Sequence, residues 1–250
     1  MTGIVTLCSG SEGNSSLVIN GERLVLIDAG ASARTILQRV EELGFKKENV
    51  EGLFITHEHS DHCKGTAVLR KRLPDMPVYT SAGTARALDI ADARVVTCGE
   101  CVSCAGLDFV PFPTPHDAAE SFGFVVYEDG KKHIGYCTDI GFVTDDIRES
   151  LLGCKIVVLE SNYDENMLML GSYPYELKRR IKSKKGHLSN EECDLFISEL
   201  AKSGTEKIIL AHLSCENNMP ELALAGARLA AGEATVCVAP RKEPSEAYYA

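Results

Sequence analysis

The stretch His57-Glu58-His59-Ser60-Asp61-His62 decides how this chain folds and what chemistry it can perform. The apolar run from Leu53 to Thr56 precedes it and predicts a buried strand, and apolar residues at helical spacing follow, with Ser60 as the expected N-cap. On an extended segment His57 and His59 point to one side, whereas Asp61 and His62 lie where the chain turns. Core packing does not explain three crowded imidazoles, because buried polar groups without partners are costly. The stretch therefore suits two metal ions better than one.

Length and composition indicate one large core. The chain has 250 residues, 44% hydrophobic and 25% charged, so we expect a single domain over 1–250 with a loosely held tail from about residue 240. No apolar run approaches the roughly 18 residues of a membrane helix. Ten cysteines occur without a signal-peptide pattern, so we expect a cytoplasmic protein with reduced thiols and no membrane partner. The net charge of −10 argues against general coating of nucleic acid but leaves room for a local basic track.

The order of strand and helix patterns is typical of an α+β fold. Many strands, with helices early and late in the chain, fit two sheets packed face to face with helices outside. Asn20-Gly21 and Asp129-Gly130 predict hairpin turns. We expect strands over 4–7, 17–19, 24–27, 53–56, 78–80, 95–96, 107–112, 122–128, 133–138, 156–159, 207–210 and 235–238, and helices over 33–43, 60–74, 84–88, 189–201 and 220–229.

Three further residues share one feature with the opening stretch, because His116, Asp139 and His212 each follow a strand pattern directly. If the strand ends meet at one edge, these side chains converge there. We expect Asp139 to bridge two ions, and His187 competes with His212 as a ligand. Imidazole and carboxylate without thiolate suit zinc or manganese, and iron as well. The expected ligands are His57, His59 and His116 for one ion and Asp61, His62 and His212 for the other.

The order of these motifs resembles that of the metallo-β-lactamase-fold hydrolases: Asp28, then the opening stretch, then the three residues that follow strands. The resemblance implies a four-layer αββα sandwich with a dimetal site at one edge of the two sheets. It does not imply antibiotic hydrolysis. Asp28 is expected to orient a ligand histidine rather than to bind metal.

Shorter motifs resemble one branch of these hydrolases, the YycJ (WalJ-like) family, whose members are regarded as relatives of DNA exonucleases or phosphodiesterases. No insertion is long enough for an additional nucleic-acid-clamping domain, which argues against long RNA substrates. The motifs are Ser9-Gly10-Ser11-Glu12-Gly13-Asn14, Pro115-His116-Asp117-Ala118, Gly186-His187-Leu188-Ser189 and Ala211-His212-Leu213-Ser214.

Two divalent ions would favour hydrolysis, because a water held between them loses a proton near neutral pH. We expect Asp61 to orient the resulting hydroxide. His187 is the candidate proton donor to the leaving oxygen, or a phosphate ligand; the alternative is that it packs the turn before a helix. We therefore expect a phosphodiesterase resembling DNA exonucleases. The alternatives are a thioester or lactone hydrolase on the same site and a non-catalytic nucleic-acid-binding or sensor protein.

Candidate substrate contacts come from two segments. Six cations occur in the ten residues that end at His187, and Lys184 and Lys185 are the members expected to guide a polyanion to the site. A solvated helix face is the alternative. Ser11 and Asn14 belong to a small-residue turn whose N–H groups could bind phosphate, or which is simply a tight turn.

The string Cys98, Cys101 and Cys104 lies outside these motifs. Its spacing allows a metal site with another thiol. The glycines beside it favour a hairpin with free thiols instead.

Overall fold

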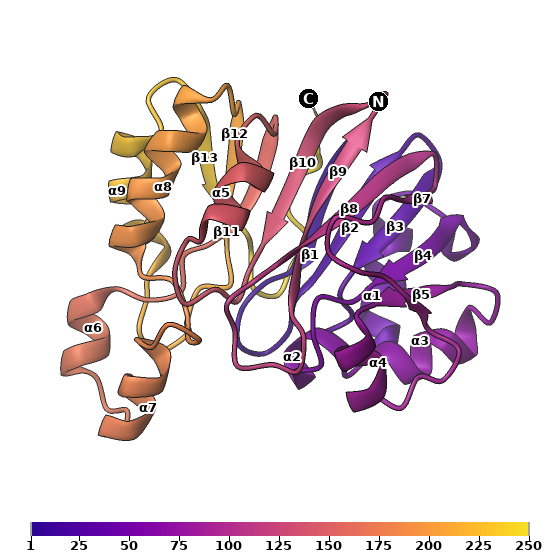
Figure 1. The fold of residues 1–250 in the computed structure, drawn as a ribbon, viewed down its shortest axis with the longest axis horizontal. Coiled ribbons are helices and arrows are strands. Elements are labelled where there is room, and N and C mark those ends of the chain that lie inside the picture. The colour runs from indigo at the N-terminus through magenta and orange to yellow at the C-terminus, as the bar shows by residue number, and fades with distance from the viewer. Residues whose placement is uncertain (1, 250) are drawn as a thin grey trace.

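Two mixed sheets packed face to face form the body of the molecule (Figure 1). The computed structural model describes residues 2–249. An apolar cluster that includes Ile4, Phe54, Phe109 and Phe124 fills the space between the sheets. Two further clusters join the outer faces of the sheets to helices. This arrangement confirms the predicted α+β fold with four αββα layers.

The first sheet has the strand order β14-β1-β2-β3-β4-β5-β6. Most residues of its strands from β1 to β5 are buried, because both faces of this part of the sheet are covered. Val25 and Ile27 enter the layer between the sheets, whereas Leu24 and Leu26 face the outer helices. The strands are β1 (Thr2–Cys8), β2 (Ser15–Asn20), β3 (Arg23–Ile27), β4 (Val50–Phe54), β5 (Val78–Thr80), β6 (Arg94–Val95) and β14 (Tyr248–Tyr249).

The second sheet has the order β13-β12-β11-β10-β9-β8-β7. Its strands from β10 to β13 run parallel, so their carboxyl ends lie at the same edge. No strand range was predicted for β7, but the glycines beside the cysteine string favoured a hairpin there, and β7 pairs with β8 across a short hairpin. The strands are β7 (Val102–Cys104), β8 (Leu107–Pro113), β9 (Phe122–Glu128), β10 (Lys131–Cys137), β11 (Ile156–Glu160), β12 (Lys207–Ala211) and β13 (Thr235–Val238).

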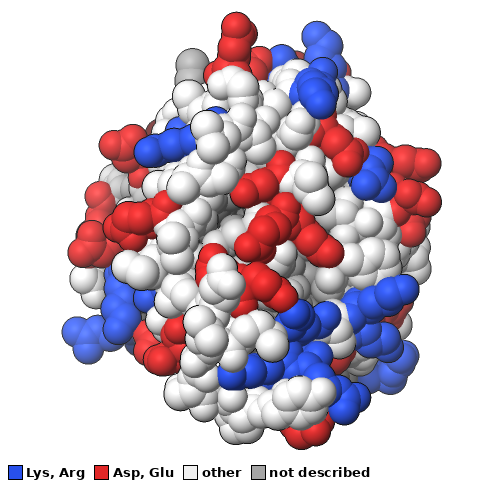
Figure 2. Space-filling model, turned by 90° about the vertical axis from the view of Figure 1, so that its left-hand side faces the viewer, with Lys and Arg blue, Asp and Glu red and all other residues white. Residues whose placement is uncertain are grey.

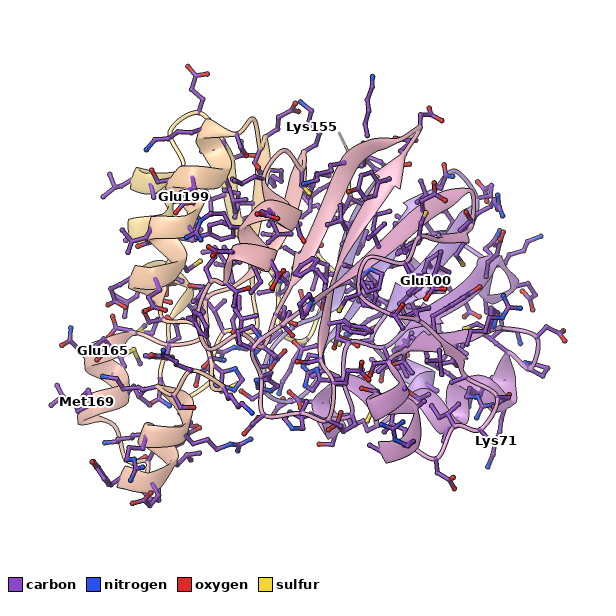
Figure 3. All side chains as sticks on the ribbon, in the orientation of Figure 1. Lys71, Glu100, Lys155, Glu165, Met169 and Glu199 are labelled. Carbon is purple, nitrogen blue, oxygen red and sulfur yellow. The ribbon has the colours of Figure 1, made fainter. Side chains whose placement is uncertain are left out.

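Helices cover the outer face of each sheet. Buried residues of α1 and α3 pack on the first sheet, and those of α5, α8 and α9 pack on the second. The pair α6 and α7 lies at one end of the molecule, and Figure 3 shows Glu165 and Met169 on the outer side of α6. Over residues 2–249, no helix is both long enough and apolar enough to cross a bilayer. The helices are α1 (Ala33–Glu42), η1 (Lys47–Asn49), α2 (Ser60–Cys63), α3 (Thr66–Arg72), α4 (Ala82–Ala87), α5 (Asp145–Leu151), α6 (Glu165–Leu170), α7 (Tyr175–Ile181), α8 (Asn190–Lys202) and α9 (Pro220–Ala230).

The helix predicted after the histidine stretch is interrupted. Its N-cap is His59 rather than Ser60, α2 ends at Cys63, and Gly65 caps the separate helix α3. The reason is a close backbone approach, because a Cβ on Gly65 would lie 2.2 Å from the carbonyl oxygen of Ala31. A continuous helix with side chains at this point would push the histidine loop away from the loop after β3.

The tail is held more firmly than predicted. The backbone N–H of Ser245 donates to the Thr6 carbonyl at 2.9 Å, and its hydroxyl accepts from the Thr6 N–H at 3.0 Å. Beyond it, β14 pairs antiparallel with β1. An uncovered edge strand presents unpaired backbone groups, and this pairing satisfies them. The expectation of a loose tail is therefore wrong for residues 245–249.

One half-buried carboxyl makes stability depend on pH. Asp194 on α8 faces Gly226 on α9, where an added Cβ would lie 1.8 Å from Asp194 Oδ2. Burial, with a smaller effect of the Glu191 charge, raises the pKa of Asp194 to about 6. Because the pKa in the folded state exceeds that in the unfolded state, the protein gains stability as pH falls through about 6, and ionised Asp194 destabilises it above that pH.

We expect Asp194→Asn to stabilise the fold at pH 8 but not at pH 4. The gain is on the order of 1 kcal/mol once solvent screening of this half-buried group is allowed for. That corresponds to a rise in melting temperature of about 2–4 °C. Thermal unfolding of both proteins in the same buffers measures the difference, and an equal shift at both pH values would show that ionisation of Asp194 is not the cause.

Candidate metal centre

The residues of this site lie just after the carboxyl ends of strands. Asp28 follows β3, His57 follows β4, Asp139 follows β10 and His212 follows β12. The backbone of Asp28, Asp139 and His212 is left-handed, with φ of 63°, 59° and 56°. This conformation costs a non-glycine residue about 1–2 kcal/mol, and such strain gathers at functional sites.

Three histidines form the first group. The ligand atoms of His57, His59 and His116 lie within 4.8 Å of one another, and His59 Nδ1 is 3.2 Å from His116 Nε2. Burial lowers the pKa of His116 and, together with the charge of His62, holds that of His57 well below its ordinary value. Both imidazoles are thereby kept neutral, which is the form that binds a metal.

A carboxylate and two histidines form the second group. Atoms of Asp61, His62 and His212 also lie within 4.8 Å of one another. Asp61 Oδ2 is 3.6 Å from His62 Nε2 and 3.3 Å from His212 Nε2. Burial opposes ionisation of Asp61, but the hydrogen bond with His212 and the charge of His62 lower its pKa. The group thus combines an ionised carboxylate with two imidazoles.

Asp139 lies between the two groups. Its Oδ2 is 3.1 Å from His62 Nε2, and its Oδ1 is 3.6 Å from His212 Nε2 and 3.8 Å from His116 Nε2. Although Asp139 is buried, the charges of His212 and His62 hold its pKa well below its ordinary value. Burial alone would lower the pKa of His212, yet Asp139 and Asp61 raise it to about 10. The centre therefore attracts positive charge.

One unpaired atom tests whether metal fits here. His57 Nε2 is buried and has no hydrogen-bond partner among residues 2–249. Buried polar atoms normally have partners, so this nitrogen calls for a ligand. His57, His62 and Asp139 also form a compact ligand group of their own. The donor set fits divalent metal.

Buried neighbours hold the ligand rings in place. Asp28 Oδ2 lies 2.7 Å from His62 Nδ1, so Asp28 occupies the orienting position that the sequence suggested. The Thr56 hydroxyl donates to Asp28 and lies 3.0 Å from His57 Nδ1. Such partners fix which ring nitrogen is free to bind metal.

Sequence reasoning missed Glu160, the last residue of β11. This fully buried carboxylate lies 2.8 Å from His187 Nδ1 and 3.0 Å from His212 Nδ1. It also accepts the backbone N–H groups of Ile140 and Leu188. Despite burial, the charge of His187 and its hydrogen bond lower the pKa of Glu160. The strand-end rule that selected Asp139 could have found Glu160.

Known proteins are similar to this chain in sequence and in fold. A model of the "Beta-lactamase superfamily domain" matches residues 23–213. Exodeoxyribonuclease YycJ of Bacillus anthracis is 36% identical over 224 residues, which cover 87% of this chain and 84% of that protein. The chain belongs to the YycJ/WalJ family. Exodeoxyribonuclease WalJ of Streptococcus pneumoniae is 34% identical over 226 residues, covering 87% and 83%. The predicted family resemblance is thus confirmed.

A solved structure supports the fold of this YycJ/WalJ family member. The metallo-β-lactamase fold protein YhfI of Bacillus subtilis superposes with a TM-score of 0.76 at 14% identity, covering 98% of this chain and 99% of that one. At this identity the likeness concerns the fold alone.

His187 faces the centre of this YycJ/WalJ family member. Its Nδ1 lies 3.6 Å from Asp139 Oδ1, and its ring centroid is 5.3 Å from that of His116 and 5.2 Å from that of His212. Because Glu160 engages Nδ1, the other nitrogen, Nε2, is free for substrate. The side chain is 21% exposed.

The two turn residues expected to contact substrate differ in exposure. Asn14 is buried, accepts from the Gly10 N–H at 2.8 Å and lies 3.1 Å from His62 Nε2. It therefore stabilises the turn beside the centre, and its contact with substrate stays a prediction. Ser11 is exposed and lines a small pocket beside His187.

Lys184 and Lys185 lie beside the loop that follows Asp139. The backbone of Lys184 packs against Gly141, and its ammonium lies 5.7 Å from the ring centroid of Phe142. Both side chains belong to exposed residues. Their role in binding substrate stays a prediction.

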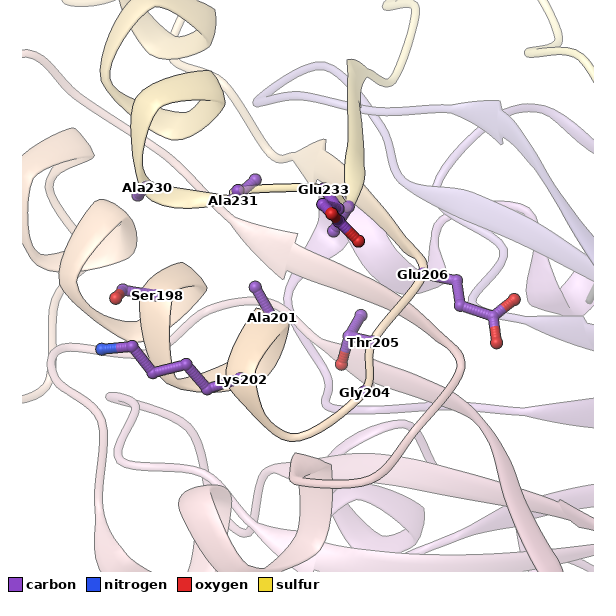
Figure 4. A pocket seen from close by; sticks show the side chains of 11 residues that line it. Ser198, Ala201, Lys202, Gly204, Thr205, Glu206, Ala230, Ala231 and Glu233 are labelled. Carbon is purple, nitrogen blue, oxygen red and sulfur yellow. The ribbon is translucent and has the colours of Figure 1, made fainter.

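Other features of the surface offer no rival centre. A hollow of about 520 Å³ between the ends of α8 and α9 is lined mainly by small residues and shares none with the metal centre (Figure 4). Cys98 and Cys101 are exposed and Cys104 is buried, all as free thiols. Within residues 2–249 they belong to no compact ligand group.

Proposed function

We propose that this protein is a dimetal-dependent phosphodiesterase that removes nucleotides from DNA ends. The observation that carries the proposal is the pair of ligand groups with Asp139 between them, at the shared edge of the two sheets. Relatives that match most of the chain are named exodeoxyribonucleases. A basic segment beside the centre adds affinity for polyanions.

The ligand groups suit two divalent ions of zinc or manganese, with iron as a further choice. His57, His59 and His116 would hold one ion, Asp61, His62 and His212 the other, and Asp139 both. When bound, such ions activate water and neutralise the charge of a phosphodiester.

The residues of the chain supply orientation and proton transfer. Asp61 would accept a hydrogen bond from the attacking water and direct its lone pair at phosphorus; the other proton of this water is released to solvent as its oxygen bonds to phosphorus, and the bond to the leaving oxygen breaks. His187 donates a proton from Nε2 to the leaving oxygen, while Glu160, 2.8 Å from Nδ1, stabilises the imidazolium before transfer. The arrangement assigns acid catalysis to a residue outside the two ligand groups.

The two alternative functions, a thioester or lactone hydrolase and a non-catalytic binding or sensor protein, explain less of the structure. Cations near the centre do not assist hydrolysis of a neutral thioester or lactone. A protein that only binds or senses nucleic acid does not need a complete set of metal ligands.

The ten cysteines, all within residues 2–249, are free thiols, which supports a reducing, cytoplasmic location.

We expect purified protein to contain about two divalent ions per chain. Chelation should abolish phosphodiester hydrolysis and lower the melting temperature, since ligands that bind only the folded state stabilise it. Zinc or manganese should restore both, and a thioester tested in parallel should not be hydrolysed. Elemental analysis, thermal unfolding and release of labelled nucleotides from DNA ends measure these effects. Full activity with no bound ion, or faster thioester than phosphodiester hydrolysis, would refute the proposal.

A further inference from the structure

The cations of the basic segment have different surroundings. Lys178 donates to the carbonyls of Met169 and Gly171, and Lys182 pairs with Glu165. These contacts attach α7 to α6. Figure 2 shows Lys and Arg side chains gathered at the lower end of the face that carries these helices, with acidic side chains above them.

Two neighbouring arginines on α7 differ in the direction they face. Arg179 lies 3.7 Å from Glu176, one turn earlier on an exposed face, and its side chain is 67% exposed. Arg180 is 59% exposed, but it donates from Nε to Asp117 Oδ2 at 2.6 Å and lines the pocket beside His187. The two residues carry the same charge on the same helix, but of the two only Arg180 lines this pocket.

The pocket beside Arg180 adjoins the metal centre. Its volume is about 160 Å³, and Ser11, Tyr173, Arg180, His187 and Ser214 are among its lining residues. Asp117, whose Oδ2 accepts from Arg180, has its Oδ1 3.4 Å from His116 Nε2. The carboxylate of Asp117 therefore lies between the Arg180 guanidinium and a proposed metal ligand, so the pocket is next to the centre.

We infer that this pocket binds the sugar and phosphate of the nucleotide next to the scissile phosphate, and that Arg180 contacts that phosphate. The inference rests on the proposed function and names the residue that selects DNA strands over small phosphodiesters. A volume well below the roughly 300 Å³ of a drug-sized site suits one such group. Asp117 holds Nε, which leaves the terminal N–H groups of Arg180 for phosphate oxygens, the geometry that arginine recognises best.

The contact is independent of base identity, because phosphate groups carry no sequence information. Ser11 and Ser214 line the same pocket, and a serine hydroxyl can donate to a phosphate or sugar oxygen. Tyr173 is a further lining residue. The pocket thus fits the backbone of any DNA strand whose next phosphate lies at the metal centre.

A matched pair of variants tests the inference. We expect Arg180→Ala to raise the Kd of metal-loaded protein for a short single-stranded DNA with hydrolysis-resistant phosphorothioate linkages by about tenfold or more, a loss of about 1.4 kcal/mol. Arg179→Ala removes the same charge from the outer face and should change Kd by no more than about twofold. The dependence of log K on log salt should flatten by about 0.7 for Arg180→Ala. Fluorescence anisotropy at several salt concentrations measures both quantities.

Equal losses in the two variants would overturn the inference, because they would show a general charge effect. If Arg180→Ala does not fold, Arg180→Lys decides the matter: lysine keeps a charge beside Asp117 but lacks the planar fork, so we expect about threefold weaker binding. Wild-type affinity in that variant would also overturn the inference. Failure of wild-type protein to bind or cleave any DNA would instead refute the proposed function.

Discussion

His59→Ala is expected to lower metal-dependent phosphodiester hydrolysis by about 10³-fold or more while the protein stays folded. The His59 side chain is 30% exposed, so its removal leaves no large cavity. It takes away one of the three imidazoles of the first ligand group, and two imidazoles hold an ion much more weakly. Because the proposed chemistry needs both ions, loss of one removes most of the rate.

His133→Ala is the matched control for this variant. His133 lies 3.2 Å from the Thr2 carbonyl and 3.5 Å from Glu128, away from both ligand groups. Its replacement should leave metal content and turnover close to wild type. Turnover rates and elemental analysis of both variants decide the matter, and a His59→Ala protein with unchanged turnover and two ions would exclude the site.

His187→Ala is expected to slow DNA cleavage by about 10²–10⁴-fold, the usual contribution of a general acid. The 3′- or 5′-oxygen that leaves DNA is strongly basic and needs a proton. A p-nitrophenolate leaves without one, so hydrolysis of a p-nitrophenyl phosphodiester should fall much less. The ratio of the two losses, measured with the same preparation, reports proton donation specifically.

Metal content separates this role from ligation. His187 also belongs to a compact group with Asp139, Glu160 and His212, so a metal role is the competing explanation. We expect His187→Ala to keep its full complement of ions. Loss of an ion, together with equal losses on both substrates, would identify His187 as a ligand instead of an acid.

Local sequence predicts most of this architecture because the strands carry their own apolar pattern. The positions of Asp139 and His212 follow from that pattern, since each comes directly after an apolar run and the ends of parallel strands share one edge. Glu160 was missed although it also ends an apolar run, because a single carboxylate at the end of a strand is typical of an ordinary turn residue. The left-handed backbone of Asp28 leaves no mark in the sequence, since tertiary contacts impose it.

Long-range contacts explain what local sequence did not predict. Asn14 resembles a phosphate-binding turn residue, and its side chain also lies against His62, 48 residues later. The helix break at Gly65 depends on the position of Ala31. The sequence of the tail has no strong strand pattern, and it forms a strand because it pairs with β1. In each case the deciding partner is distant along the chain.

The ligands come from both halves of the sandwich. His57, His59, Asp61 and His62 follow strands of the first sheet, whereas His116, Asp139 and His212 follow strands of the second. An ion held by both sets would link the two sheets directly, in addition to the apolar layer and the few hydrogen bonds between them, such as that from the His212 N–H to the Ser9 hydroxyl. The same ions would then support both hydrolysis and the packing of the two sheets. In a cell short of these ions, the protein would lose activity and stability together.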